Sequence, residues 1–330
     1  MNNDFRSYTH EETGSAGTWC PLPGLAAIFL SALFSPVQTI AADLKPETIQ
    51  AWNEYIRAAE GRNLKHVSQA NVFLAIDALP AEAAKLRQGD IIASPAASNV
   101  PVKVPAGLIH DWTGAIFIPN AALHDVLQVV RDYGQYKAVY HPSVVGAKPL
   151  ETSEWEDRFS MVVMNKSFFA KSALDSDYHS TFTRMDDQRW YSVSQTTRVQ
   201  EVAEYGGPSQ YMLPQDHGTG IIWRIYSIAR YQERDGGVYV ELEAIVLSRD
   251  IPGGMRWLVE PIVRRVSRSS LVVSLQETAD AVRSSTNISR APETLRCSAA
   301  NCAAAATLNE RRAPSAHALT SAVDGQGVHP

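Results

Sequence analysis

The clearest hydrophobic pattern lies in residues 230–282, where an alternation of period two is followed by a helical repeat. Val238 and Val240 belong to one parity of the alternating part, which is apolar throughout. The other parity begins with Tyr239 and Glu241 and becomes apolar towards its end. Because successive side chains of a strand point to opposite faces, this pattern predicts a long strand with one apolar face and one mixed face.

Apolar residues then recur every three to five positions and predict one long amphipathic helix that ends the folded part. These residues are Met255, Leu258, Ile262, Val266, Leu271, Leu275, Thr278 and Val282. Arg264, Arg265 and Arg268 remain for the other face of the helix. Pro261 lacks a backbone donor, so a kink or a restart of the helix is expected there.

Upstream of this stretch the pattern predicts three helices and many strands. Residues 46–60 are typical of a helix, and residues 80–87 have the composition of one. Pro119-Asn120 starts the third, with Asn120 as its N-cap. Strand-like segments are 63–77, 102–118, 143–151, 155–169, 178–185, 190–204, 218–233 and 237–248. Turn signals separate the later strands, among them Asp-Ser-Asp at 175–177 and Asp-Gly-Gly at 235–237. Long strands with short connections indicate an antiparallel meander.

The two ends differ in composition from the part between them. Residues 25–34 form a short apolar run before small residues at 41–42, which resembles a secretory signal, although the preceding residues are not basic. We expect a leader at 1–42 and export to the periplasm or the medium; the alternative is a cytoplasmic protein. Residues 284–330 contain no Phe, Trp or Tyr, which predicts a disordered tail. Residues 43–283 then form one domain.

Charge and cysteine content exclude several classes of site. The net charge of −5 gives no indication of a nucleic-acid surface. The three cysteines, Cys20, Cys297 and Cys302, all lie outside the predicted domain, so no disulfide framework or thiolate metal site is expected there. The histidines show no metal-binding spacing, and no nucleophile elbow, P-loop or dinucleotide fingerprint occurs. We therefore expect no cofactor and no metal.

Three segments resemble a known family. They are Tyr133-Gly134-Gln135-Tyr136-Lys137 after a helix, the run 237–252 with its Gly-Val-Tyr-Val-Glu-Leu-Glu start, and the closing helix around Ser270-Leu271. With the order of elements, they resemble the START-like branch of the birch-pollen-allergen superfamily over about 46–283. The resemblance implies an α+β helix-grip fold, a curved antiparallel sheet of about nine strands around a long C-terminal helix. It also implies an apolar cavity under that helix, for a lipid, sterol, polyketide or other apolar ligand.

Polar or aromatic residues of the strands and of the last helix are the candidates for the cavity wall. They are Arg184, Arg198, Trp223, Arg224, Tyr226, Glu241, Glu243 and Trp257. An Arg–Glu pair between the strands 218–233 and 237–248 is expected, because strands joined by a tight hairpin are neighbours. It either orients a polar ligand head inside the cavity or lies on a solvated outer face, where it contributes little. The rarity of buried charge favours the outer face, and the aromatic residues are more typical of core.

Three functions remain open. The first is a non-enzymatic carrier of an apolar molecule. The second is a cyclase or aromatase that uses the same cavity, with Glu241 or Glu243 as the acid–base group. The third is an exported scaffold whose core is filled by its own side chains. No catalytic motif was found, which favours the carrier over the enzyme. The expected partner is an apolar small molecule. Transient contact with a membrane is also expected, and the sequence does not indicate the number of subunits.

Overall fold

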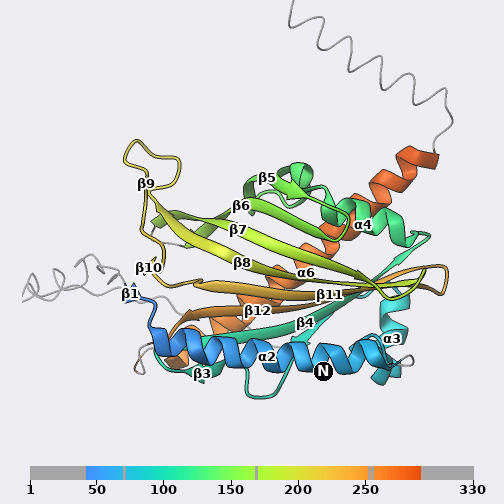
Figure 1. Ribbon diagram of the computed structural model, residues 1–330, viewed down its shortest axis with the longest axis horizontal. Coiled ribbons are helices and arrows are strands. Elements are labelled where there is room, and N and C mark those ends of the chain that lie inside the picture. The colour runs from blue at the N-terminus through green and yellow to red at the C-terminus, as the bar shows by residue number, and fades with distance from the viewer. Residues whose placement is uncertain (1–41, 70–71, 168–169, 252–253, 255, 291–330) are drawn as a thin grey trace, which may run out of the picture. The chain divides into compact units, whose positions relative to one another are not determined.

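An antiparallel sheet of ten strands organises the part of the chain that the structure describes. The computed structural model describes residues 42–69, 72–167, 170–251, 254 and 256–290, all within one compact unit (Figure 1). The order across the sheet is β2-β4-β12-β11-β8-β7-β6-β5, with β3 also on β4 and β9 on β8. The strands are β2 (Ile92–Pro95), β3 (Val102–Val104), β4 (Gly107–Pro119), β5 (Val144–Thr152), β6 (Glu156–Ser167), β7 (Ala170–Arg184), β8 (Arg189–Ala203), β9 (Tyr211–Met212), β11 (Arg224–Arg234) and β12 (Gly237–Arg249).

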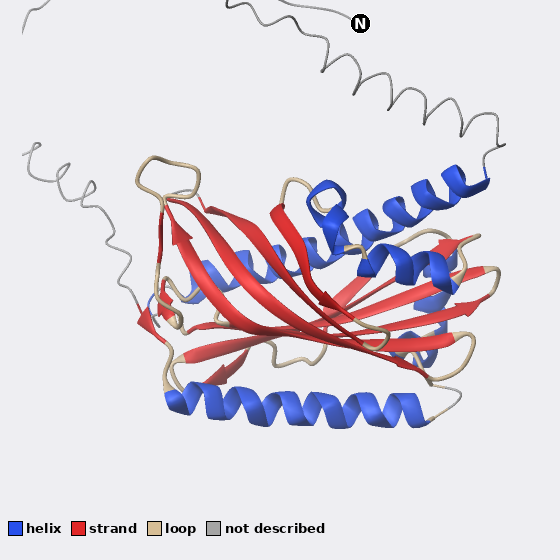
Figure 2. Ribbon diagram, turned by 45° about the horizontal axis from the view of Figure 1, so that its top comes forward, coloured by secondary structure: helices blue, strands red, loops and turns tan. Residues whose placement is uncertain are grey.

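Helices pack on both faces of this sheet. They are α2 (Pro46–Ser68), α3 (Pro80–Arg87), α4 (Leu123–Arg131), α5 (Tyr136–Val139) and α6 (Arg256–Arg290), with short 3₁₀ turns η1 (Ala75–Ala78) and η2 (Tyr133–Gln135). A separate two-stranded ladder joins β1 (Ala42–Asp43) to β10 (His217–Gly218). Figure 2 shows α2 along one side of the sheet and α6 crossing the other.

The alternation in β12 decides which helix covers which face. Val238 and Val240 are buried against α4 and α6, in a cluster with Leu271 of α6. Tyr239 packs in a cluster near α3, and Ile245 packs against α2, both on the opposite face. The parity that was read as uniformly apolar therefore faces α6, and the mixed parity faces α2 and α3.

Close packing of α6 on the sheet depends on Gly114 in β4. A Cβ atom at this position would lie 2.9 Å from side-chain atoms of both Leu271 and Leu275. Ala279 and Val282 continue the same buried stripe along α6. Only a glycine lets the helix approach the middle of β4 this closely, so α6 is fixed at a short distance from that side of the sheet.

The fold predicted from the sequence is confirmed as an α+β helix-grip arrangement with a long C-terminal helix. Most predicted strands match observed ones within a few residues. The segment 63–77 is different: its first part extends α2 to Ser68, and its last part contains η1. Asn63, buried in α2, accepts a hydrogen bond from Arg230 of β11, which favours the longer helix.

Two turn or cap predictions were also wrong. Residues 175–177 continue β7, because Asp175 and Asp177 both pair with Arg198 on the neighbouring strand, and this pairing compensates their poor strand propensity. Helix α4 begins at Leu123 after Ala122, whereas Asn120 adopts a positive φ of 60° in the preceding turn.

The domain limits remain predictions at both ends. The predicted leader lies outside the described residues, except for Ala42 in β1. The predicted tail also lies outside them after Arg290, and α6 continues beyond the expected limit at Arg283 to that residue. Pro261 lies inside α6.

Candidate functional site

A cleft of about 580 Å³ lies between the sheet and α6, and we call it the α6 cleft. The floor of the cleft consists of strands β6, β7, β8, β11 and β12, and α6 forms one wall. The segment from α4 to the start of β5 closes one end of the cleft. Its apolar and aromatic lining consists of Val130, Tyr133, Tyr136, Tyr140, Val144, Phe159, Met161, Val163, Met164, Tyr178, Phe182, Ile225, Ala229, Tyr231, Val240, Leu242, Ala244, Val273 and Leu275. Its other lining residues are Ser143, Ser180, Ser192, Ser194, Ser227, Ser269, Ser270, Ser274, Glu277 and Thr278.

Stacked aromatic rings form one end of the α6 cleft. The ring of Phe159 lies between those of Tyr133, at 4.1 Å between centroids, and Tyr178, at 4.8 Å, with all three nearly parallel. Tyr136 packs edge-on against Phe159 and Tyr140. These contacts make a flat, rigid aromatic wall, because stacked and edge-to-face rings add attraction to the burial of their area.

An ion pair holds this wall against the sheet. Arg131, at the end of α4, donates from Nε and Nη2 to the two carboxylate oxygens of Asp157 in β6, each at 2.8 Å. Tyr133 Oη donates to the same carboxylate at 2.9 Å. The carboxylate of Asp157 is fully buried, and Arg131 also donates to the carbonyl of Glu154. A buried, bidentate pair of this kind restricts how far the wall can move.

The tyrosines of the cleft are neutral hydrogen-bonding groups. Burial raises the pKa of Tyr133, Tyr136, Tyr140 and Tyr178, and it raises the pKa of Tyr231 to about 12. Their phenols therefore stay protonated at neutral pH. The cleft offers hydroxyl groups in an otherwise apolar surface, which is the usual composition of a small-molecule site.

The opposite face of the sheet carries a buried charged network beneath α2. Arg230 Nη1 donates to Glu241 Oε1 at 2.7 Å, and both side chains are almost fully buried. The amides of Ala75 and Ile76 donate to the two oxygens of Glu241. Arg230 Nε also donates to Asn63 Oδ1 at 3.0 Å. The network connects two sheet strands to α2 and η1.

A second group of charges extends this network along α2. Arg62 Nη2 donates to Glu243 Oε1 at 3.0 Å and to Asp111 Oδ2 at 3.1 Å. Tyr55 Oη also donates to Asp111 Oδ2, at 2.7 Å, while Oδ1 of this fully buried carboxylate has no protein partner. Burial and the nearby Glu243 raise the pKa of Asp111 to about 6, against the opposing effect of Tyr55 and Arg62.

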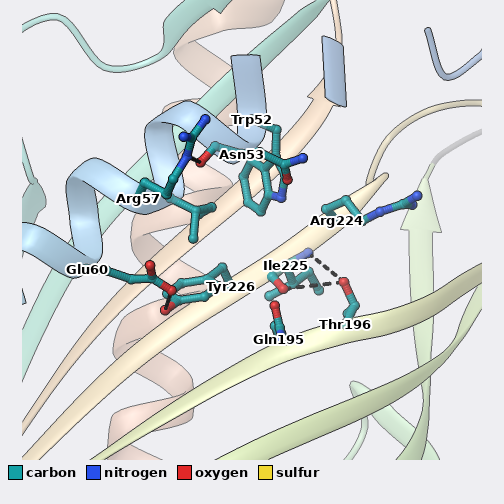
Figure 3. Close-up of a pocket in the computed structure, with 10 residues that line it drawn as sticks. Trp52, Asn53, Arg57, Glu60, Gln195, Thr196, Arg224, Ile225 and Tyr226 are labelled. Carbon is teal, nitrogen blue, oxygen red and sulfur yellow. Dashed lines mark hydrogen bonds between the residues drawn. The ribbon is translucent and has the colours of Figure 1, made fainter. Parts of the chain in front are cut away.

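Figure 3 shows a smaller, more polar hollow of about 260 Å³ at the edge of α2. It is lined by Trp52, Asn53, Ile56, Arg57, Glu60, Gln195, Thr196, Arg224, Ile225 and Tyr226. Tyr226 Oη donates to Glu60 at 2.9 Å, and Arg224 pairs with Asp216 at 2.7 Å. Thr196 Oγ1 accepts a hydrogen bond from the amide of Ile225. These polar groups are engaged in hydrogen bonds and ion pairs with other protein groups. We therefore interpret the hollow as a gap at the contact between α2 and the sheet, and not as a preformed ligand site.

None of the eight residues expected in the cavity wall is among those that line the α6 cleft. Glu241 and Glu243 lie beneath α2, because their parity in β12 is the one that faces that helix. Trp223 is buried in the core on the α2 side. Arg224 and Tyr226 line the α2 hollow instead.

The remaining three candidates lie at the surface or in cross-strand ion pairs. Arg184 pairs with Asp187 at the end of β7, where both are exposed. Arg198 pairs with Asp175 and Asp177. Trp257, near the start of α6, is 77% exposed. The expected Arg–Glu pair between β11 and β12 does exist, as Arg230 and Glu241, but it is buried and turned away from the cleft.

The sequence contained one signal for the lining of the α6 cleft and one pattern that concealed it. Tyr133 and Tyr136 stand in a motif that carried the family resemblance, but nothing in the motif showed that the rings face a cleft. Ser192 and Ser194 alternate in β8 with Tyr191 and Val193, so a reading of polarity alone places the serines outside. The sheet reverses this, because the serines face the cleft and the larger residues face α2.

Comparison with known proteins gives matches to solved structures alone. No family model and no curated protein sequence matches the chain. A STAR-related lipid transfer protein from Xanthomonas axonopodis is 19% identical, over 59% of this chain and 97% of that one, with a TM-score of 0.35. Human STARD10 is 9% identical, over 55% and 71%, with a TM-score of 0.37. The Zhui aromatase/cyclase from Streptomyces sp. R1128 is 12% identical, over 53% and 94%, with a TM-score of 0.34.

The strand order and the long C-terminal helix of the described residues give the protein a helix-grip fold. A lipid transfer protein and an aromatase/cyclase are thus among the solved structures that match.

Two further properties of the described residues concern metals and membranes. They contain no group of three His, Cys, Asp or Glu side chains placed to hold a metal ion. Among the helices that the structure describes, none is both long enough and apolar enough to cross a membrane.

Proposed function

We propose that this protein binds an apolar small molecule in the α6 cleft and carries it without changing it chemically. The observation that supports this most directly is the cleft itself. Its volume of about 580 Å³ falls within the range of roughly 300–1,000 Å³ that is usual for small-molecule sites. A lipid, a sterol or a polyketide-like molecule is the proposed ligand class.

The physical basis of binding is the burial of apolar surface. Each Å² of apolar ligand surface removed from water contributes about 25 cal/mol before the costs of association are subtracted. The aromatic wall around Phe159 and the aliphatic floor at Val240 and Leu242 provide this surface. The bidentate ion pair of Arg131 with Asp157, which we call the clamp, holds the aromatic wall in place before the ligand binds. Less conformational entropy is therefore lost on binding.

The cyclase alternative lacks support at the site of the proposed chemistry. An acid–base residue must reach the reacting atoms. Glu241 and Glu243, the residues suggested for that role, lie beneath α2 on the other face of the sheet. The phenols that do line the cleft have raised pKa values because of burial, which makes them poorer acids at neutral pH. The scaffold alternative requires a filled core, which the cleft volume does not favour.

Titration of the full-length protein with a neutral fluorescent apolar probe tests this proposal. The variant Ala244→Trp places an indole on the cleft floor, and we expect it to weaken probe binding by about tenfold or more. The matched control is Thr183→Trp, because Thr183 belongs to the parity of β7 that faces away from the cleft. Equal probe affinity of both variants and the unmodified protein would contradict the proposal.

Transient membrane contact is a finer part of the same proposal. Ile262 and Val266 in the first half of α6 are 56% and 55% exposed, and Arg265 and Arg268 on the same helix are exposed. Apolar side chains next to arginines favour the surface of an anionic bilayer. Co-sedimentation with phosphatidylserine vesicles should fall when Ile262 and Val266 are both replaced by Glu, and unchanged sedimentation would argue against contact through this helix.

A further inference from the structure

The α6 cleft lacks positively charged groups. Among its lining residues there is no Lys, Arg or His, and Glu277 is the single residue with a carboxyl group. Burial and the nearby Asp280 raise the pKa of Glu277, while His141 opposes the shift. The guanidinium group of Arg131, which lies over the ring of Phe182, is already bound to Asp157. An anionic head group inside the cleft would therefore lose its hydration without gaining an opposite charge.

Hydroxyl groups, by contrast, form an ordered row across the cleft floor. Ser180, Ser194 and Ser227 are direct cross-strand partners on β7, β8 and β11. Neighbouring strands lie about 4.8 Å apart, so the backbones of the three serines follow one another at about that distance. Ser180 Oγ donates to Ser194 Oγ at 2.8 Å, which leaves the Ser194 hydroxyl free to donate onward.

The α6 wall repeats this pattern. Ser270, Ser274 and Thr278 follow one another at intervals of four residues and all line the cleft. This spacing places them on one side of the helix, about 6 Å apart along its axis. Thr278 Oγ1 also lies 3.0 Å from Tyr140 Oη. Two separate elements therefore present hydroxyl rows to the same apolar space.

A core that only had to be packed would not place hydroxyls here. Apolar side chains fill such positions at no desolvation cost, whereas each buried hydroxyl needs a partner. Ser180 and Ser192 are 4% and 7% exposed, and their hydroxyls already have protein partners, Ser194 Oγ at 2.8 Å and Tyr231 Oη at 3.2 Å. The hydroxyl of Ser194 can still donate, and Ser227 is its neighbour in the row, so a ligand oxygen would bind at these two residues.

We propose that the α6 cleft selects neutral molecules that carry two or more hydroxyl or keto groups on an apolar skeleton, and rejects carboxylates of the same skeleton. This inference rests on the proposed binding function and specifies its ligand class. The serine row binds the ligand oxygens, the aromatic wall binds the flat or apolar part, and the absence of a cation excludes acids.

Matched sets of ligands test this selectivity. One set is the hydrocarbon androstane, an androstanediol and a hydroxyandrostane carboxylic acid; the other is hexadecane, hexadecanediol and hexadecanoic acid. Each competes with a neutral fluorescent probe on the full-length protein at pH 8. In the set that fits, we expect the diol to bind about tenfold more tightly than the acid. Acid binding should improve when the pH falls below about 4.5 and the acid becomes neutral, whereas diol binding should not change.

Two variants connect the selectivity to named residues. Ser227→Ala should weaken diol binding by about threefold to tenfold and leave hydrocarbon binding unchanged, because one hydrogen bond is lost. Glu277→Gln should improve acid binding at pH 8 with little effect on the diol. Thr183→Ala on the opposite face of β7 is the control for both.

The outcomes separate this inference from the proposed function. If diol, hydrocarbon and acid bind equally, or if Ser227→Ala leaves the diol unaffected, the selectivity is contradicted while ligand binding stands. If no member of either set displaces the probe and the probe itself does not bind, both proposals are contradicted.

Discussion

Arg230 and Glu241 face each other across β11 and β12 and form a buried ion pair, with 2.7 Å between Nη1 and Oε1, on the sheet face that carries α2. Their side chains are 2% and 1% exposed. Glu241 also accepts from the amide of Ile76, and Arg230 donates to Asn63 of α2. The pair thus fixes the outer helix to the sheet and takes no part in the α6 cleft.

Removing one partner of this pair should destabilise the fold strongly. In Glu241→Ala the guanidinium of Arg230 loses its main counter-charge, and the amides of Ala75 and Ile76 lose their acceptor. We expect a loss of about 3–5 kcal/mol in the free energy of unfolding, measured by urea denaturation.

The control for that variant is an exposed pair of the same type. Arg158 and Glu151 lie 3.8 Å apart and are 62% and 72% exposed. Glu151→Ala should change the free energy of unfolding by less than about 1 kcal/mol. Similar effects of the two variants would show that the buried pair does not hold α2 in place.

The difference between the residues expected in a cavity wall and those that line the α6 cleft has a physical origin. Alternation in β12 was enough to predict the strand, but it could not show which face meets the cleft. That depends on α2, whose last part was taken for a strand although it supplies Asn63 to Arg230. Both faces of this sheet are covered by helices, so the polar residues beneath α2 are buried and polarity no longer identifies the solvent side.

The hydroxyl row could not be predicted from the sequence either. Ser180, Ser194 and Ser227 come from three strands, and they form a row only because of the register between those strands. Strand register depends on turns and on bulges such as the one between Asp177 and Tyr178, which composition does not reveal. The order of the later elements, from the helix before Tyr133 to the closing helix, follows by contrast from local periodicity and was predicted correctly.

Gly114 should be sensitive to any larger side chain. In Gly114→Val the new side chain would overlap Leu271 and Leu275, so α6 must move away from β4. We expect destabilisation of about 1–3 kcal/mol and weaker probe binding, because α6 forms one wall of the cleft. Thermal and urea denaturation measure the first effect, and probe titration the second.

Gly61 in α2 provides a control, because a larger side chain there should raise the stability of the protein instead of lowering it. A Cβ atom there would meet nothing within 4 Å, and the residue lies within a helix. Gly61→Ala should therefore stabilise the protein by about 0.5–1 kcal/mol. If Gly114→Val were as harmless as Gly61→Ala, the close packing of α6 on β4 would be excluded.

His110 and Asp111, adjacent in β4, should make opposite contributions to stability between about pH 4 and 6.5. Burial lowers the pKa of His110 to about 4, so its contribution is present above the unfolded pKa of about 6.5 and is lost as the pH falls. Burial raises the pKa of Asp111 to about 6, so its contribution is present below about pH 4 and is lost as the pH rises through 6. Each amounts to about 3 kcal/mol, and the two nearly cancel.

Two variants separate these contributions. Relative to the unmodified protein, Asp111→Asn should lose stability as the pH is lowered from 6.5 to 4, because the effect of His110 is no longer opposed. His110→Gln should gain stability over the same interval. Urea denaturation at several pH values measures both differences. Parallel curves for all three proteins would mean that these groups titrate at the same pKa in the folded and unfolded states.

The clamp between Arg131 and Asp157 should matter for binding as well as for stability. Arg131→Met leaves the buried carboxylate of Asp157 without its bidentate partner, although Tyr133 still donates to it. We expect a loss of about 3–5 kcal/mol in stability and a faster release of bound probe, measured by stopped-flow displacement. Arg184→Met, which removes an exposed ion pair, should change neither quantity appreciably.

Native mass spectrometry of the full-length protein, compared with its denatured mass, shows whether the α6 cleft holds a ligand. We expect a non-covalent adduct of small-molecule size that co-purifies with the protein and disappears on denaturation. The adduct should be reduced in Ala244→Trp and retained in Thr183→Trp. A bare protein that takes up no apolar probe, or an adduct of equal occupancy in both variants, would contradict binding in the α6 cleft.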